Sequence, residues 1–362
     1  NIFPLLGPYL ADEFPEITQF ARFEREPRAF VKANGHQFVE DRFFYADSSA
    51  LEIFSFPLLK GSKKTALSEP YSLLITEETA LKYFGKNQAV GKVLNVNDSH
   101  DFKITGVLQN IPENSHIKFD FLASLSTIEE QNSDYGKIWS SMSAYTYVLL
   151  ASGTSPETLE RKIDRLLSAH FPDNSSRWHF FLQPLTSIHL HSHLGYEIES
   201  NGDIRYVYMF TAVAFFMLLI ACVNFMNLAT ARSSSRAKEV GIKKMLGAGR
   251  GYLARQFMAE SLAVTLAAVP VSLILVDFFF DILKPFFGES LSMDYLKNPG
   301  FFLGLLLIAI VTGLISGIYP ALLLSSFRTA SVLYGKFRSG LKASAFRKVL
   351  VVFQFFISVL LI

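Results

Sequence analysis

The stretch YVYMFTAVAFFMLLIACVNFMNLATA, residues 206–231, decides the class of this protein. Its 26 residues include no Asp, Glu, Lys or Arg. About 20 consecutive apolar residues are enough for a helix that crosses a lipid bilayer. The stretch is therefore long enough to span a membrane with some tilt, and it does not lie at the N-terminus, where a secretory signal would.

The rest of the C-terminal half agrees with a membrane protein. Only 18% of the 362 residues are charged, against about 25% in a typical soluble domain. Two further apolar stretches follow, and we expect three transmembrane helices at about 206–230, 261–283 and 300–325. Residues 331–362 indicate a linker and the start of a further transmembrane helix, which stops at Ile362 before it is long enough to span.

Charge is distributed unevenly between the two halves and predicts an orientation. Residues 1–205 hold 19 basic and 26 acidic side chains, whereas residues 206–362 hold 15 basic and 6 acidic ones. Two short segments of the second half, 232–260 and 328–348, carry seven and six basic residues. Because short loops rich in Lys and Arg stay in the cytoplasm, we expect both segments inside and the acidic N-terminal half outside.

The N-terminal half has a different pattern, with short apolar segments between turn residues. We expect strands at 72–76, 102–107 and 145–150, a helix at 77–84 capped by Thr76 and stopped by Gly85, and an amphipathic helix at 156–170. The predicted fold class is a mixed α/β extracytoplasmic domain followed by an all-α polytopic membrane domain. We expect the first domain at 1–203 and the second at 204–330, with a missing membrane helix ahead of Asn1.

The chain offers little enzymatic chemistry. His189, His191 and His193 alternate, which on a strand would place three imidazoles on one face and permit a metal site, but no further ligand spacing accompanies them. Residues 85–93 (GKNQAVGKV) only superficially resemble a phosphate loop, because Val93 replaces the Ser or Thr that binds magnesium. The single cysteine, Cys222, excludes a disulfide framework. We therefore expect no catalytic residue, no cofactor and no metal.

Residues 236–248, RAKEVGIKKMLGA, are the most informative part of the inner segment. At helical spacing Ile242, Met245 and Leu246 share one face, and Glu239 and Lys243 form a favourable i,i+4 pair. Such a helix at the inner membrane surface has two physical interpretations. It either lies on anionic lipid or inserts into a groove of a partner protein, and the spacing alone does not decide between them.

Several segments resemble FtsX-like permeases of the ABC transporter superfamily, in particular the MacB-type group with a large extracytoplasmic domain. They are RAKEVGIKKMLGA with the following QFMAESL (256–262), the preceding NFMNLATARS (224–233), PLTSIHLHS (184–192) and TGVLQNIPENSHIKFDF (105–121). The resemblance implies that the histidines are an ordinary part of the first domain. Residues 346–362 resemble the opening helix of a second permease unit in chains that hold two.

The resemblance also implies a function. It implies a non-catalytic permease subunit that couples ATP hydrolysis by a separate cytoplasmic ATPase to movements of a periplasmic domain, for export or extraction of a substrate. The partners would be that ATPase, a second permease unit in the same chain or as a dimer, and a periplasmic adaptor; no nucleic acid is expected. The location would be the inner membrane, with several passes.

The resemblance assigns ATPase coupling to ten residues of segment 232–260: Arg236, Lys238, Glu239, Gly241, Ile242, Lys243, Lys244, Met245, Leu246 and Gly247. The alternative function is a membrane-anchored sensor or scaffold that regulates an envelope process without an ATPase. In that case the basic segment would only bind lipid.

Overall fold

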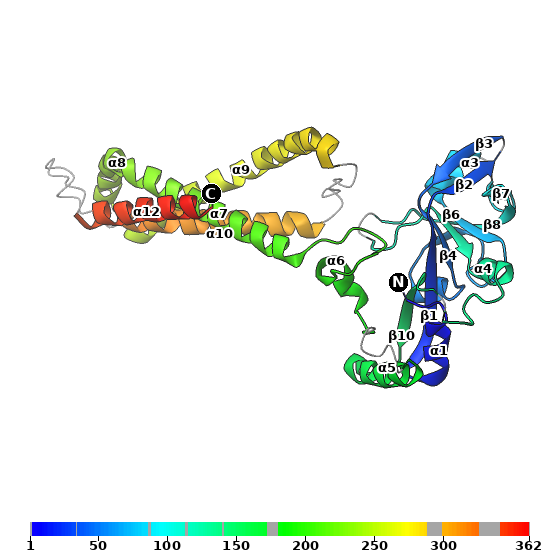
Figure 1. The fold of residues 1–362 in the computed structure, drawn as a ribbon. Helices are drawn as coiled ribbons and strands as arrows, with labels where there is room; N and C mark the ends of the chain where they lie inside the picture. Colours follow the sequence, from blue (N-terminus) through cyan, green and yellow to red (C-terminus); the bar gives the residue numbers. More distant parts are fainter. Residues whose placement is uncertain are drawn as a thin grey trace. The chain divides into compact units, whose positions relative to one another are not determined.

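The computed structural model describes residues 2–33, 35–85, 88–112, 115–139, 141–171, 180–287, 299–325 and 341–361. The chain divides into two compact units, which are described separately: an N-terminal unit, Asn1–Ile204, and a C-terminal unit, Arg205–Ile362. Figure 1 shows strands in the first unit and long helices in the second. The predicted fold class is confirmed: a mixed α/β domain precedes a domain of long apolar helices.

The N-terminal unit is built on one mixed sheet of ten strands, in the order β10-β1-β4-β9-β6-β8-β7-β2-β3, with β5 paired to β8. The pairs β4–β9 and β6–β8 are parallel, and the other pairs are antiparallel. The strands are β1 (Ile17–Glu26), β2 (Ala29–Ala33), β3 (His36–Glu40), β4 (Phe43–Ala46), β5 (Leu58–Lys60), β6 (Ser72–Thr76), β7 (Val93–Val96), β8 (His100–Leu108), β9 (Phe121–Ser124) and β10 (Tyr145–Leu150).

Six helices border this sheet in the described part of the unit, and two of them, α3 and α5, are the helices that the sequence predicts. They are α1 (Leu6–Glu13), α2 (Ala50–Ile53), α3 (Glu77–Phe84), α4 (Ser126–Gln131), α5 (Pro156–His170) and α6 (Ile188–His191), the last preceded by a 3₁₀ turn (Leu185–Ser187). The Thr76 hydroxyl accepts the Thr79 N–H at the start of α3. Ser155 does the same for α5, which has Pro156 in its first turn, the position where proline suits a helix.

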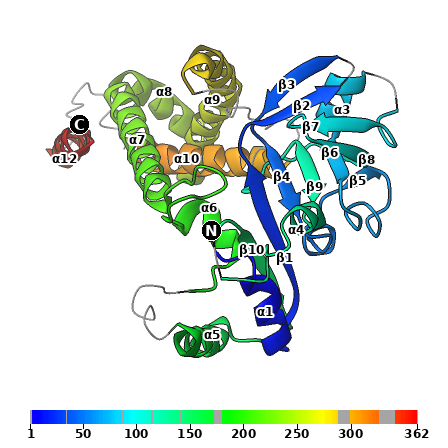
Figure 2. The same cartoon turned by 45° about the vertical axis from the view of Figure 1, so that its right-hand side comes forward.

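The central strands of the sheet are buried on both faces. Side chains of a strand alternate between the two faces, and successive residues of β4 lie in two different buried clusters. Phe43 and Tyr45 of β4 belong to one hydrophobic cluster, whereas Phe44 and Ala46 belong to the other. A third cluster contains side chains of both α1 and α5, and Figures 1 and 2 show the two helices at the end of the sheet near β1 and β10. Leu159, Ile163 and Leu167 of α5 are buried there, and Leu166 is partly buried against the same cluster.

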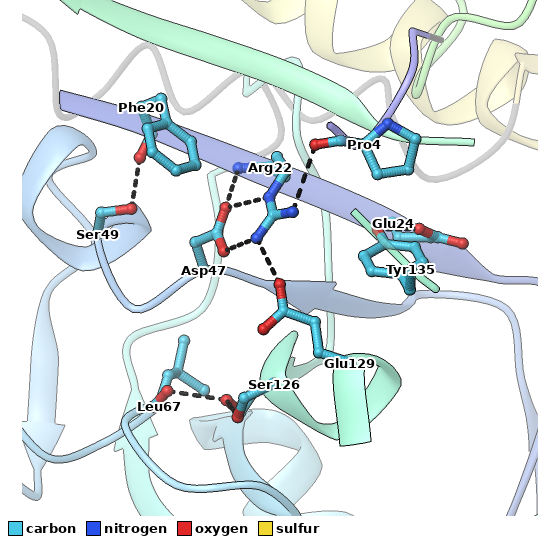
Figure 3. A network of polar contacts seen from close by, with 11 residues as sticks. Pro4, Phe20, Arg22, Glu24, Asp47, Ser49, Leu67, Ser126, Glu129 and Tyr135 are labelled. Carbon is cyan, nitrogen blue, oxygen red and sulfur yellow. Dashed lines mark hydrogen bonds and ion pairs between the residues drawn. The ribbon is translucent and has the colours of Figure 1, made fainter. Parts of the chain in front are cut away.

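A buried ion network fastens β1 to its neighbours (Figure 3). Arg22 is only 5% exposed, and its guanidinium donates to both carboxylate oxygens of Asp47 at 2.8 and 2.9 Å. The same group donates to Glu129 of α4 at 2.8 Å and to the carbonyl oxygen of Pro4 at 3.3 Å. One arginine thus joins β1, the segment after β4, α4 and the N-terminal segment.

The C-terminal unit consists of α7 (Ile204–Ala231), α8 (Ser233–Met245), α9 (Arg250–Phe287), α10 (Pro299–Ser325) and α12 (Leu341–Leu360). Among the residues that the structure describes, three helices are long and apolar enough to cross a membrane: α7, the stretch Arg250–Leu283 of α9, and the stretch Pro299–Leu322 of α10. The second helix is longer than the predicted apolar stretch, because it begins in the basic segment eleven residues earlier.

Candidate functional site

The candidate site is α8, the helix between the first two spans. It follows α7 after one residue and ends in a tight turn in which Gly247 adopts a φ of +94°. The N–H groups of Gly247 and Ala248 donate to the carbonyl oxygens of Lys244 and Lys243 at 3.1 and 3.0 Å. This is the double hydrogen bond with which a left-handed glycine closes a helix. Gly247 therefore ends α8 and lets α9 start at Arg250.

One face of α8 packs against the membrane helices. Val240 is 1% exposed and shares a hydrophobic cluster with Leu253 and Phe257 of α9 and with Ala321 and Leu324 of α10. Gly241, next to Val240, is also buried. The inner face of α8 thus contacts both α9 and α10.

Two basic side chains of α8 form hydrogen bonds with α9. Arg236 donates two hydrogen bonds of 2.6 Å to the two carboxylate oxygens of Glu260 on α9, a paired geometry that fixes orientation as well as charge. Lys243 contacts Glu239 at 2.7 Å, the predicted i,i+4 pair, and Gln256 of α9 at 3.2 Å.

Lys244 reaches the other membrane helix. Its ammonium group donates to the carbonyl oxygen of Ser325, the last residue of α10, at 2.6 Å. A cation is favourable at this position, because a helix ends in carbonyl groups without internal partners. Together with the contacts of Arg236 and Lys243, this bond ties α8 to α9 and α10.

The opposite face of α8 is apolar and exposed. Ile242, Met245 and Leu246 are 46%, 55% and 82% exposed, and their predicted common face is confirmed. Lys238 and Glu239 are exposed as well. The helix thus turns its largest aliphatic side chains away from the protein while Val240 fills its inner face.

Small residues, among them Gly313 and Gly317 at a spacing of four, allow α9 and α10 to approach closely. A Cβ atom added to Gly317 would lie 2.9 Å from the Cβ atom of Ser261, and one added to Gly313 would lie 3.1 Å from the Cα atom of Leu262. Both distances are shorter than ordinary van der Waals contacts between carbon atoms. The two helices that α8 contacts are therefore packed directly against each other.

The histidine segment differs from one interpretation of the sequence. His189 and His191 lie on the short helix α6, not on a strand, and His193 follows it. Alternate residues of a helix do not share a face. The strand that would place the three imidazoles on one face is therefore not present in these described residues, and that interpretation of the segment is wrong. Within the described part of the chain, no group of three or more His, Cys, Asp and Glu side chains could hold a metal ion.

The partners of α8 are the functional residues that spacing did not reveal. Glu260 lies 24 residues after Arg236, and Ser325 lies 81 residues after Lys244. Periodicity within a helix carries no information on such distant pairs. A signal for two of them was present, because the segment QFMAESL that shares the family resemblance contains both Gln256 and Glu260.

Comparisons with known proteins identify both units. The model of the MacB-like periplasmic core domain matches residues 5–166, and the model of the FtsX-like permease C-terminal domain matches residues 211–328. The two matches together cover more than three quarters of the chain. The chain is a membrane protein of the ABC transporter permease class; it belongs to the FtsX-like permeases of MacB type.

The solved structures that are similar to part of this chain include the following three. One is a domain of a protein described as a permease from Porphyromonas gingivalis, with 22% identity, 51% of this chain and 83% of that chain covered, and a TM-score of 0.44. The second is the periplasmic region of MacB from Actinobacillus actinomycetemcomitans, with 13% identity and a TM-score of 0.40; the match covers 52% of this chain and 81% of that chain. The third is the extracellular domain of the noncanonic ABC-type transporter YknZ from Gram-positive bacteria, with 14% identity and a TM-score of 0.34; the match covers 43% of this chain and 78% of that chain. No curated protein matches the chain.

Proposed function

We propose that this permease couples ATP hydrolysis by a separate cytoplasmic ATPase to movements of its N-terminal domain, and that the ATPase docks on α8. The observation that carries the proposal is the exposed apolar face formed by Ile242, Met245 and Leu246. An amphipathic helix that presents such a face fits a groove on a partner protein. Lys238 and Glu239 border this face, and Gly241 and Gly247 set the packing and the end of the helix.

The contacts behind this face support transmission of force. Arg236 and Lys243 hold α8 to α9, and Lys244 holds it to the end of α10. A displacement of α8 by the ATPase would therefore move two adjoining membrane helices together. In this scheme the chain itself performs no hydrolysis.

The remaining parts of the proposal concern location and partners. The basic inner segments favour a cytoplasmic α8 and a periplasmic N-terminal domain, in a multi-pass protein of the inner membrane. A second permease unit, in the same chain or as a dimer, and a periplasmic adaptor would complete the transporter. The direction of transport would be export or extraction of a substrate from the periplasm or the membrane.

A sensor or scaffold without an ATPase is the second candidate function, in which α8 only binds anionic lipid. The contacts of Arg236, Lys243 and Lys244 count against it, because these cations already have partners within the protein. Exposed basic residues, Lys238, Arg250 and Arg255, would have to supply the attraction to lipid.

The test is retention of the co-expressed ATPase by two double variants. Burial of Met245 and Leu246 in a groove contributes at most about 1.5–3 kcal/mol for each side chain, and about 1.4 kcal/mol is a tenfold change in affinity. We therefore expect Met245→Ala/Leu246→Ala to weaken ATPase retention at least about tenfold and to lower transport-coupled ATP hydrolysis.

The matched control is Arg250→Gln/Arg255→Gln, which removes two exposed charges outside the ten coupling residues and leaves the apolar face intact. Exposed charges contribute about 0–1 kcal/mol, so this variant should retain the ATPase almost fully. Full retention by the apolar variant, with release of the protein from anionic vesicles by the charge variant, would reject the docking model in favour of lipid binding.

A further inference from the structure

A second exposed apolar surface lies in the N-terminal unit, in the segment that leads to α7. Residues 180–196 contain no Asp, Glu, Lys or Arg, although residues 1–205 as a whole carry 45 of these side chains. Several large apolar side chains of this segment are exposed: Phe181, Leu185, Leu194 and Tyr196. A stretch that lacks charge and exposes aromatic and aliphatic groups is unusual on a surface that faces only water.

The most exposed of these side chains lie on a turn that is held rigidly at its base. The Ser192 hydroxyl donates to the Glu197 carboxylate, which closes the turn over residues 193–196. Ile198, directly after it, is buried in the core of the sheet domain. The Tyr145 hydroxyl donates to the carbonyl oxygen of Tyr196 at 2.7 Å.

Tyr196 itself has an unfavourable backbone conformation. Its φ is +60°, in the left-handed region that is uncommon for a bulky residue other than glycine. The side chain that this conformation carries is 85% exposed, and that of Leu194 is 53% exposed. Strained residues that persist in a fold point to a function for the side chain they position, and here the strain presents an aromatic ring to the outside.

The turn is close in sequence to the first membrane-spanning helix. α7 begins at Ile204, eight residues after Tyr196, so the connecting segment spans at most about 29 Å. The first turns of α7 carry Tyr206 and Tyr208, both exposed. Tyrosine is enriched at the water interface of membranes, where its apolar ring and its hydroxyl are both satisfied.

We propose that the turn 193–196 is a membrane anchor that inserts Leu194 and Tyr196 into the headgroup layer of the lipid bilayer next to α7. The proposal goes beyond the proposed function and does not depend on it; it requires only that α7 spans the membrane. The lack of Asp, Glu, Lys and Arg over residues 180–196 and the short connection to α7 favour phospholipid over a protein partner. The anchor would restrain the N-terminal domain close to the bilayer surface.

Spin labelling of the full chain in phosphatidylcholine vesicles tests the proposal. In a Cys222→Ser background, which removes the only native cysteine, a nitroxide is attached to Tyr196→Cys or, separately, to Leu194→Cys. The control is Leu81→Cys on α3, a side chain 59% exposed that has the charged neighbours Glu78 and Lys82. Collision rates with oxygen, which concentrates in lipid, and with a water-soluble nickel chelate are then compared.

We expect the ratio of oxygen to nickel collisions to be at least several-fold higher at Leu194 and Tyr196 than at Leu81. The two labelled positions guard against disturbance of the turn at either one. Equal ratios at all three positions would overturn the proposal. Protection from nickel that appears at positions 194 and 196 only after a protein partner is added would also overturn it, in favour of a protein docking site.

Discussion

Large apolar side chains are mostly buried in the N-terminal unit and mostly exposed along the helices of the C-terminal unit. In the N-terminal unit, Phe43 and Phe121 are fully buried between the sheet and its covering helices. In the C-terminal unit, Phe279 and Leu303 are exposed, whereas Gly317 and Ser261 lie inside the contact between α9 and α10. In water, apolar side chains face the protein interior, whereas in lipid they face outward and small residues fill the contacts between helices.

Two surfaces do not fit either pattern, and both carry a proposal. The face of Ile242, Met245 and Leu246 is exposed on a helix rich in Lys and Arg, outside the apolar spans. The turn 193–196 exposes Tyr196 to 85%, on a domain whose largest fully buried side chains are phenylalanines. Lipid along a membrane helix accounts for neither, so each requires a contact of its own.

The largest expected effect compares the same substitution in the two units. Phe121→Ala removes a fully buried ring from the sheet and should lower the free energy of unfolding of the N-terminal unit by about 3–5 kcal/mol. Phe279→Ala, on the exposed side of α9, should change the free energy of unfolding of the C-terminal unit by less than about 0.5 kcal/mol. Both tryptophans lie in the first 205 residues, so their fluorescence during urea unfolding follows the N-terminal unit, and thermal unfolding in detergent micelles follows the C-terminal unit. Similar losses for the two variants would refute the comparison.

The ion network of the N-terminal unit gives the next effect. Arg22→Gln leaves Asp47 without its cation at a site where its side chain is only 17% exposed, and removal of one partner from a buried pair costs about 3 kcal/mol or more. Arg25→Gln on the same strand removes only exposed hydrogen bonds to the Asp41 carbonyl oxygen and serves as the control. The same urea titration measures both variants. If Arg22→Gln and Arg25→Gln unfolded at the same urea concentration, the network would not contribute to the stability of the unit.

The contact between α9 and α10 gives a smaller effect. Gly317→Val forces a side chain against Ser261, and overpacking of this kind costs about 1–3 kcal/mol. Gly304→Val introduces the same residue on the same helix at a position with no heavy atom within 4 Å, so it controls for helix propensity. Thermal unfolding in detergent micelles should show a lower midpoint for Gly317→Val alone. Equal midpoints would mean that close approach of the helices does not stabilise the unit.

The sequence predicted part of the local structure of the N-terminal unit and the three apolar helices of the C-terminal unit. The capped helix α3, the strands β6, β8 and β10, and the inward face of α5 are encoded by short-range periodicity and by residues such as Thr76 and Ser155. The order of the ten strands was not predictable, because it pairs segments far apart in the chain, such as β1 with β10. The histidine segment was too short for periodicity to separate a strand from the helix α6.

The candidate site was predictable in part for the same reason. The apolar face of α8 and the Glu239–Lys243 pair follow from helical spacing, and both are present. The roles of Arg236 and Lys244 were not predictable, because their partners Glu260 and Ser325 are brought close only by the packing of three helices. Basic residues that suggested a lipid surface in the sequence hold α8 to α9 and α10 in the structure.

Photo-crosslinking from α8 tests the central claim most directly, because it does not require the variant to weaken anything. A photoactivatable amino acid is placed at Leu246, 82% exposed on α8, and in a separate variant at Leu303, 70% exposed near the start of α10 and expected on the opposite side of the membrane. With the ATPase co-expressed, the account predicts a crosslink to the ATPase from position 246 and none from position 303. An intact complex with no ATPase crosslink from position 246, or from Met245 probed in the same way, would contradict it.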